Sequence, residues 1–226
     1  MVKLLSKLYT KFYIWTRCTK LSFSLSHFLS RVLNSVFLFF LSGSQVAEFE
    51  SVEKLNIFLK GLEWSEDRFR FLGLSISHNW IKDARLIQRS LNRSESIQMD
   101  CDEFAAYGEA ALSRTPGVNA IEPGMLTVRW IDREGRIKGH NVAYFMYLPD
   151  SDQQLSLMKY AHLGNWGLFK NFDSVAAMAD DIAKQGGGLL ISYARVCDIK
   201  LKKHTVCKEN IASYIEDIFY VGQKSK

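Results

Sequence analysis

Cysteine and proline are scarce in this chain of 226 residues, and their scarcity limits the kinds of protein it can be. Four cysteines are too few for the disulfide framework of a small secreted protein, so an apolar core must hold the fold together. Three prolines, with no low-complexity tract and no internal repeat, give no sign of a repeat protein. Because 47% of the residues are hydrophobic, the chain is large and apolar enough for one compact domain.

Acidic residues are absent from the beginning of the chain. The first is Glu48, and six basic residues precede it: Lys3, Lys7, Lys11, Arg17, Lys20 and Arg31. The N-terminal fifth therefore carries the whole net charge of +5, and the remainder is close to neutral. A neutral body offers no basic face to a polynucleotide, so no nucleic-acid partner is predicted.

The N-terminal segment also lacks a long apolar run. The uninterrupted run Val36–Leu41 is far shorter than the roughly 20 residues that span a bilayer. Extending it back to Leu21 takes in His27, Arg31 and Asn34. The favoured interpretation is an amphipathic helix lying in a membrane surface, whose apolar face would comprise Leu21, Leu25, Phe28, Val32, Val36 and Phe39.

Two other interpretations of this segment stay open. One is an export signal with small residues Ser42 and Ser44 near a cleavage site, and the other is a helical extension packed on the domain or on a partner. The chain is accordingly divided into a segment 1–44, membrane-associating or signal-like, and a domain 45–226. The protein is expected to be membrane-associated or exported, and otherwise cytoplasmic.

The domain begins with helical patterns and continues with strand patterns, which predicts an α+β fold with an antiparallel sheet. Asn79 and Asp173 are the expected N-caps of two of its helices. Helices are expected at 45–62, 79–92, 101–114, 173–185 and 210–222, and strands at 125–132, 137–148, 157–169 and 189–196.

Cys101 stands at the start of a small-residue helix, in the sequence "DCDEFA". Asp100 can cap that helix, which puts the thiol at its first position, where the helix dipole favours a thiolate. Asp102 and Glu103 oppose this effect, so a reactive Cys101 needs a histidine partner. The alternative is that Cys101 extends the helix's packing face one turn before Phe104.

His140 and Asn165 are the candidate partners of this cysteine. If their strands pair around a turn between residues 152 and 153, the two side chains are directly opposite and share a face. The amide could then hold the imidazole in the orientation that a base requires. His162 would lie on the other face, while Asn171 and Asp173 remain substitutes for Asn165.

Three stretches, "DCDEFA", "GHNVAYF" and "GNWG", resemble motifs of the transglutaminase-like cysteine peptidase superfamily within the papain-like fold group. The resemblance covers about residues 45 to 190. It implies a papain- or transglutaminase-like α+β fold, with N-terminal helices and a nucleophile helix packed on an antiparallel sheet. Two departures are Met99, where the family usually has glycine, and Asn165, where it more often has aspartate.

The expected function is thiol-dependent acyl transfer through a Cys101–His140–Asn165 triad. Cys101 would attack a peptide or carboxamide carbonyl, and Gln98 or Trp80 would join the Cys101 backbone N–H in holding the oxyanion. Water as acceptor makes a cysteine peptidase or amidase, and an amine makes a transglutaminase-type enzyme. A lipid acyltransferase and a non-catalytic, membrane-anchored interaction module of the same fold are the alternatives. No metal or cofactor is predicted, because no set of calcium ligands can be assembled.

Overall fold

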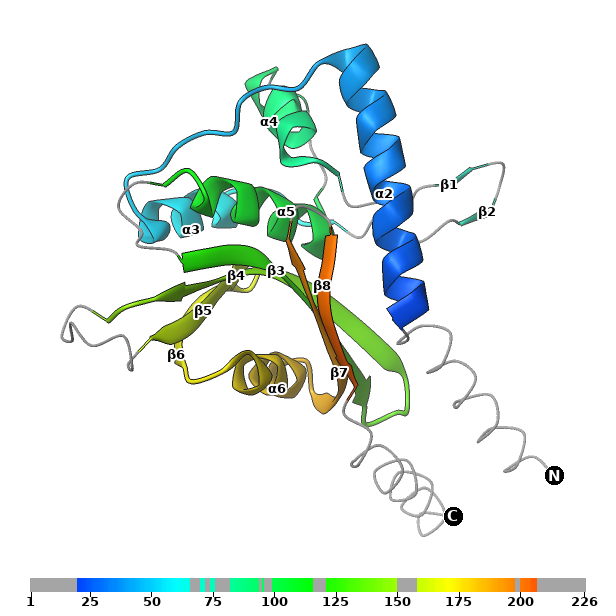
Figure 1. Ribbon diagram of the computed structural model, residues 1–226, viewed down its shortest axis with the longest axis vertical. Helices are drawn as coiled ribbons and strands as arrows, with labels where there is room; N and C mark the ends of the chain where they lie inside the picture. Colours follow the sequence, from blue (N-terminus) through cyan, green and yellow to red (C-terminus); the bar gives the residue numbers. More distant parts are fainter. Residues whose placement is uncertain are drawn as a thin grey trace, which may run out of the picture.

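A computed structural model of the chain describes residues 20–65, 70–71, 74–75, 82–93, 95, 99–115, 121–149, 158–197 and 200–206. The expected closing helix at 210–222 and the expected cap Asn79 lie outside these residues. A six-stranded antiparallel sheet with the order β6-β5-β4-β3-β7-β8 forms the centre of the molecule (Figure 1). Helices pack on it, so the predicted α+β class is confirmed.

Two long strands form the middle of this sheet, and shorter strands flank them. The expected strand at 157–169 is wrong, because the chain reverses at Asn165 and Trp166 and forms two strands. Gly164 and Gly167 lie on either side of that turn. Glycines at this spacing are a sequence signal of a hairpin, but the surrounding apolar residues make the signal hard to recognise in the sequence. The strands are β3 (Ile121–Asp132), β4 (Ile137–Tyr147), β5 (Lys159–Gly164), β6 (Gly167–Phe172), β7 (Gly188–Cys197) and β8 (Lys200–Val206), and β1 (Arg70–Phe71) pairs separately with β2 (Leu74–Ser75).

N-cap side chains set where the helices begin. Asp100 and Glu103 form the capping box that starts α5 (Cys101–Leu112) at the predicted residue. The other expected starts are too early, because Ser51, Asp83 and Ser174 accept the capping hydrogen bonds. The remaining helices are α2 (Lys20–Leu41), α3 (Val52–Lys60), α4 (Ala84–Asn92) and α6 (Val175–Gln185).

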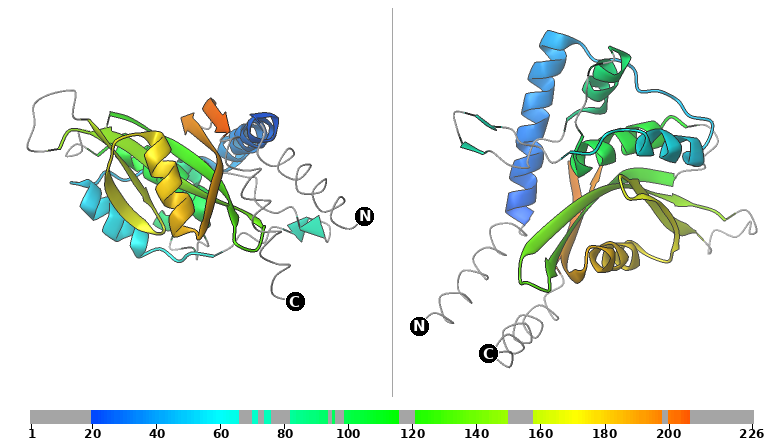
Figure 2. Two further views of the ribbon diagram at one scale, coloured as in Figure 1. Left: turned by 90° about the horizontal axis from the view of Figure 1, so that it is seen from below. Right: turned by 180° about the vertical axis from the view of Figure 1, so that it is seen from behind.

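Apolar cores lie on both faces of the sheet. On one face, α5 covers the odd-numbered β4 residues Ala143 and Phe145, and α3 and α4 pack against α5. On the other, α6 covers the even-numbered residues Val142 and Tyr144 (Figures 1 and 2). A Cβ added at Gly108 would lie 2.9 Å from the Cβ of Ala143, so α5 approaches β4 closely. Each β4 residue therefore faces either α5 or α6, according to its parity.

Candidate functional site

Cys101 is the first residue of α5 and is partly exposed. Its thiol donates to Oδ1 of Asp102, with 3.6 Å between the sulfur and the oxygen. The side-chain amide of Asn141, on β4, donates to the same oxygen. The guanidinium of Arg129 fills the space where a Cβ at Gly139 would stand. The neighbours of the thiol on the α5 face are therefore a carboxylate, an amide and a guanidinium.

The thiol of Cys101 is protonated at neutral pH. Burial raises its pKa well above the ordinary value, and the charges of Asp102 and Asp100 raise it further. A hydrogen bond with the backbone of Asn141 and the charge of Arg129 lower the pKa, but these two effects are smaller than the increase caused by burial and the carboxylates. Burial and the charges of Asp102 and Asp100 thus outweigh the helix dipole, in line with the expectation that carboxylates beside Cys101 oppose formation of the thiolate.

Asp102 is a buried carboxylate with an unusually high pKa. Burial raises the pKa to about 6, the hydrogen bond from Asn141 lowers it, and the charge of Glu103 raises it again. Asp100, Cys101 and Asp102 have ligand atoms close enough to hold a metal ion. Asp100 already accepts the N–H groups of Asp102 and Glu103, and Asp102 accepts from Cys101 and Asn141, which accounts for the cluster without an ion.

His140 lies on the opposite face of the sheet from Cys101. It pairs with Val128, which belongs to the core under α6, and its ring stacks on Trp166 with 3.9 Å between the ring centroids. Asn141, the next residue, takes the position that faces α5. The predicted Cys101–His140 pair does not form, because successive side chains of a strand point to opposite faces.

The register of the β4–β5 hairpin explains this error. Ala143 pairs with Leu163 and Tyr144 with His162, so the same register continued places Asn165 opposite Asn141, and Trp166 opposite His140. The stacking of Trp166 on His140 agrees with that register. The prediction that residues 140 and 165 are opposite is wrong by one residue, which exchanges the two faces.

The other sequence candidates do not restore a triad. His162 shares the α6 face with His140, contrary to expectation, because it pairs with Tyr144. Asn171 accepts a hydrogen bond from Tyr147, and Asp173 pairs with Lys159, both at the exposed surface. Neither orients His140. Gln98 and Trp80, the expected oxyanion donors, lie outside the described residues.

Both histidines are uncharged at neutral pH. Burial, together with the charge of His162, lowers the pKa of His140 to about 3, and burial lowers the pKa of His162 to about 4. Nε2 of His140 and both ring nitrogens of His162 have no hydrogen-bond partner in the described part of the chain. Phe169 and Phe172 stack against His162. These imidazoles serve as packing rings in an aromatic cluster.

The described side chains of α2 have their polarity reversed relative to an ordinary surface helix. Ser30 and Asn34 point inward, and Oδ1 of Asn34 accepts the backbone N–H of Asp83. Large apolar side chains point outward: Val32, Leu33, Val36, Phe37, Phe39, Phe40 and Leu41. An amphipathic helix normally buries such residues. Val32, Val36 and Phe39 of the predicted apolar face are thus exposed, while the side chains of residues 21, 25 and 28 are outside the description.

The helix α2 does not combine the length and the apolar character that crossing a membrane requires. Of the helices that the structure describes, none combines the length and the apolar character of a membrane span.

Comparisons of the chain with protein-family models, with curated proteins and with solved structures find no match. The resemblance to the transglutaminase-like superfamily thus stays a prediction from three short motifs.

Proposed function

We propose that this chain is a non-catalytic interaction module that docks on a membrane surface through the outward face of α2. The observation that carries the proposal is the exposure of apolar side chains along that helix. Proteins rarely leave such residues together in water unless a membrane or a partner covers them. For the fold, we propose a transglutaminase-like architecture. The packing of the N-terminus of α5 on an antiparallel sheet supports this proposal.

The attachment of α2 to the body leaves large apolar side chains of the helix exposed. Within the described side chains, Ser30, Asn34 and Leu38 follow one another at four-residue spacing, so one narrow stripe faces the body. Phe39 and Phe40, at the C-terminal end, are 81% and 75% exposed. Burying a phenylalanine fully contributes about 1.5–3 kcal/mol, so these two rings alone could hold the helix at an interface.

A lipid surface is the occupant that the charge pattern favours. Six basic residues and no acidic residue precede Glu48, so the segment that contains α2 is purely cationic. Each basic side chain close to an anionic bilayer adds about 1 kcal/mol of attraction. Apolar side chains combined with basic residues are typical of a helix that lies in a membrane interface. A lipid surface is therefore favoured over a protein partner.

Among the side chains that the structure describes, no imidazole lies beside the thiol, which supports the non-catalytic assignment. The carboxylates of Asp102 and Asp100, next to Cys101 in the chain, oppose ionisation of the thiol. The imidazoles of His140 and His162 are on the far side of the sheet and are buried among aromatic rings.

Sedimentation of the full chain with vesicles tests the docking proposal. The vesicles are phosphatidylcholine with and without phosphatidylglycerol, and the variants are Phe39→Asn/Phe40→Asn and the control Ile57→Asn. Ile57 is 66% exposed on α3, so the control removes an apolar surface residue from elsewhere. We expect the double variant to lose on the order of tenfold or more in binding and the control to lose little. Equal binding by all three proteins, or none by the wild type, would overturn the proposal.

A second candidate is thiol acyl transfer in which Asp102 replaces histidine as proton acceptor. The hydrogen bond from the Cys101 thiol to Asp102, with Asn141 holding the carboxylate, favours it. The proton would move from a thiol whose pKa is raised well above its ordinary value to a carboxylate of pKa about 6, which is an unfavourable transfer. Iodoacetamide labelling of Cys101 faster than that of glutathione, and lost in Asp102→Asn, would favour this enzyme over the non-catalytic module.

A further inference from the structure

His162 is enclosed by aromatic rings on the α6 face of the sheet. The residue is fully buried, and neither ring nitrogen has a hydrogen-bond partner within the described ranges. The rings of Phe169 and Phe172, both on β6, stack against the imidazole, with 4.9 Å and 5.6 Å between the ring centroids. His162 pairs with Tyr144, whose side chain belongs to the core that α6 covers. This enclosure accommodates the imidazole only while it is uncharged.

The charges on this side of the sheet do not offset a proton on His162. Burial is what lowers the pKa of its imidazole to about 4. The titratable groups that share its face on the surrounding strands are Lys138, His140 and Tyr144 on β4, Tyr160 on β5, and Arg195 on β7, which pairs with Glu122 on β3. The charged residues of α6 and of the turn before it are half-buried or exposed, and they are Asp173, Asp180, Asp181 and Lys184. Within the described residues, no carboxylate lies beside His162, so a proton there needs water.

The helix α6 belongs to a different layer from the helices α3, α4 and α5. These three helices supply the core on the opposite face of the sheet, and α6 packs on β3, β5, β6 and β7 (Figures 1 and 2). The run Gly186–Gly188 follows α6. Gly187 has a φ of +76°, and a Cβ added there would meet no atom within 4 Å. Because glycine changes its backbone conformation easily, this run can act as a hinge for α6.

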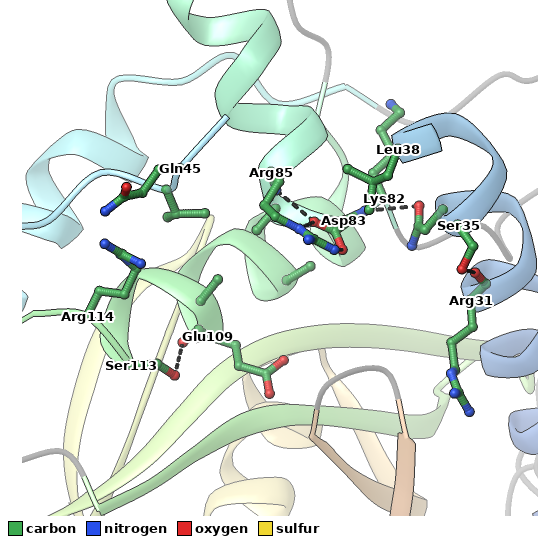
Figure 3. A pocket seen from close by; sticks show the side chains of 15 residues that line it. Arg31, Ser35, Leu38, Gln45, Lys82, Asp83, Arg85, Glu109, Ser113 and Arg114 are labelled. Carbon is green, nitrogen blue, oxygen red and sulfur yellow. Dashed lines mark hydrogen bonds and ion pairs between the residues drawn. The ribbon is translucent and has the colours of Figure 1, made fainter. Parts of the chain in front are cut away.

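The opposite layer has a polar contact that mild acid does not break. Arg85 donates two hydrogen bonds to Asp83, the N-cap of α4, at the wall of a cavity between α2, α4 and α5 (Figure 3). Burial raises the pKa of Asp83, but the hydrogen bonds from Arg85 outweigh burial and hold the pKa below the ordinary 3.8. This carboxylate therefore stays ionised at pH 5, where an exposed histidine is protonated.

We propose that α6 is an acid-sensitive cover, which opens from the sheet when His162 is protonated while the layer of α3, α4 and α5 stays folded. Opening lets water reach the imidazole. The open form then binds the proton with an ordinary pKa of 6.5, whereas the closed form binds it with a pKa of about 4. Closure is therefore strongest above pH 6.5 and weakens as the pH falls toward 4. This device does not involve α2, so it does not depend on the proposed membrane docking.

Hydrogen exchange of the full chain, measured by mass spectrometry at pH 7 and pH 5, tests the proposal. After correction for the intrinsic pH dependence of exchange, the protection of α6 amides should fall about twentyfold between the two pH values, because one proton binds on opening. At pH 5, α5 amides should remain at least about tenfold better protected than α6 amides. Equal protection of the two helices at pH 5 would show that only global unfolding exposes α6, and would overturn the proposal.

The variant His162→Phe tests whether this imidazole is the sensor. A phenyl ring keeps the stack with Phe169 and Phe172 and binds no proton, so α6 protection should change less than about twofold between pH 7 and pH 5. Urea unfolding at pH 7 checks that the variant is folded, and the wild-type comparison of α5 with α6 does not depend on it.

The matched control is His140→Phe, which removes the other described imidazole on this face. That ring is stacked on Trp166, from the β5–β6 turn, so its removal should leave the fall of about twentyfold in place. A fall that persists in His162→Phe, or one that disappears in His140→Phe, would overturn the assignment of the sensor to His162.

Discussion

Asn141 and His140 are neighbours in β4, yet their side chains enter opposite environments. Asn141 faces α5 and donates to a buried carboxylate beside a thiol. His140 faces α6 and stacks on Trp166, and its Nε2 has no hydrogen-bond partner within the described ranges. At these two residues, the α5 side of the strand makes polar contacts and the α6 side packs against a ring. The comparison shows that a polar residue in a strand cannot be assigned a role until its face is known.

Acid should weaken the α6 side most strongly. The pKa values of His140 and His162 fall from the ordinary 6.5 to about 3 and about 4, so below pH 6.5 the unfolded chain binds protons that the folded chain does not. Stability from these groups is complete above pH 6.5 and is lost as the pH falls, by about 1.4 kcal/mol per pH unit for each histidine. Asp102 opposes the loss between its folded pKa of about 6 and the ordinary 3.8, because there the folded state binds the extra proton.

The expected net loss between pH 7 and pH 5 is about 3 kcal/mol, measured by urea unfolding at a series of pH values. His140→Phe/His162→Phe should flatten that dependence. A wild-type stability that is constant over this range would contradict the neutral, buried state of the two rings.

Asn141→Leu tests the polar side and should cost about 2–3 kcal/mol at pH 7. It removes the amide donor and leaves the buried carboxylate of Asp102 with one fewer hydrogen bond, and a charged group deprived of its partner is costly. Unfolding in urea measures the change. The double variant Asn141→Leu/Asp102→Asn should recover part of the loss, because the charge is then absent. A cost that Asp102→Asn does not reduce would assign the effect to packing instead.

Local chemistry in the sequence predicts much of this fold, and the limits of the prediction have a common cause. The α+β class and the start of α5 follow from residue patterns and from the spacing of Asp100 and Glu103, which are local properties. The face on which His140 lies depends on a hairpin register, where one residue of error exchanges both faces. The direction of the apolar side of α2 also depends on tertiary packing, because a helical pattern identifies a face without saying what covers it.

Asp102→Asn should stabilise the protein at pH 7, by about 1–2 kcal/mol in urea unfolding. A carboxylate whose pKa is raised to about 6 is ionised at pH 7 at a cost, and asparagine keeps an oxygen for the hydrogen bond from Asn141 without that charge. The gain should disappear near pH 4, where the aspartate is protonated in the folded state. A loss of stability at pH 7 would indicate that Arg129 or another cation depends on the charge.

His140→Phe should have the smallest effect, a change in unfolding free energy of less than about 1 kcal/mol at pH 7. Phenylalanine keeps a ring against Trp166 and removes a buried nitrogen that makes no hydrogen bond among the described residues. The same variant should leave the rate of iodoacetamide labelling at Cys101 unchanged, because the sheet separates the two side chains. A catalytic pair behaves differently, since losing its base slows alkylation of the thiol while stability hardly changes. Slower labelling in His140→Phe, at unchanged stability, would therefore place the imidazole beside the sulfur and overturn the assignment of the two residues to opposite faces.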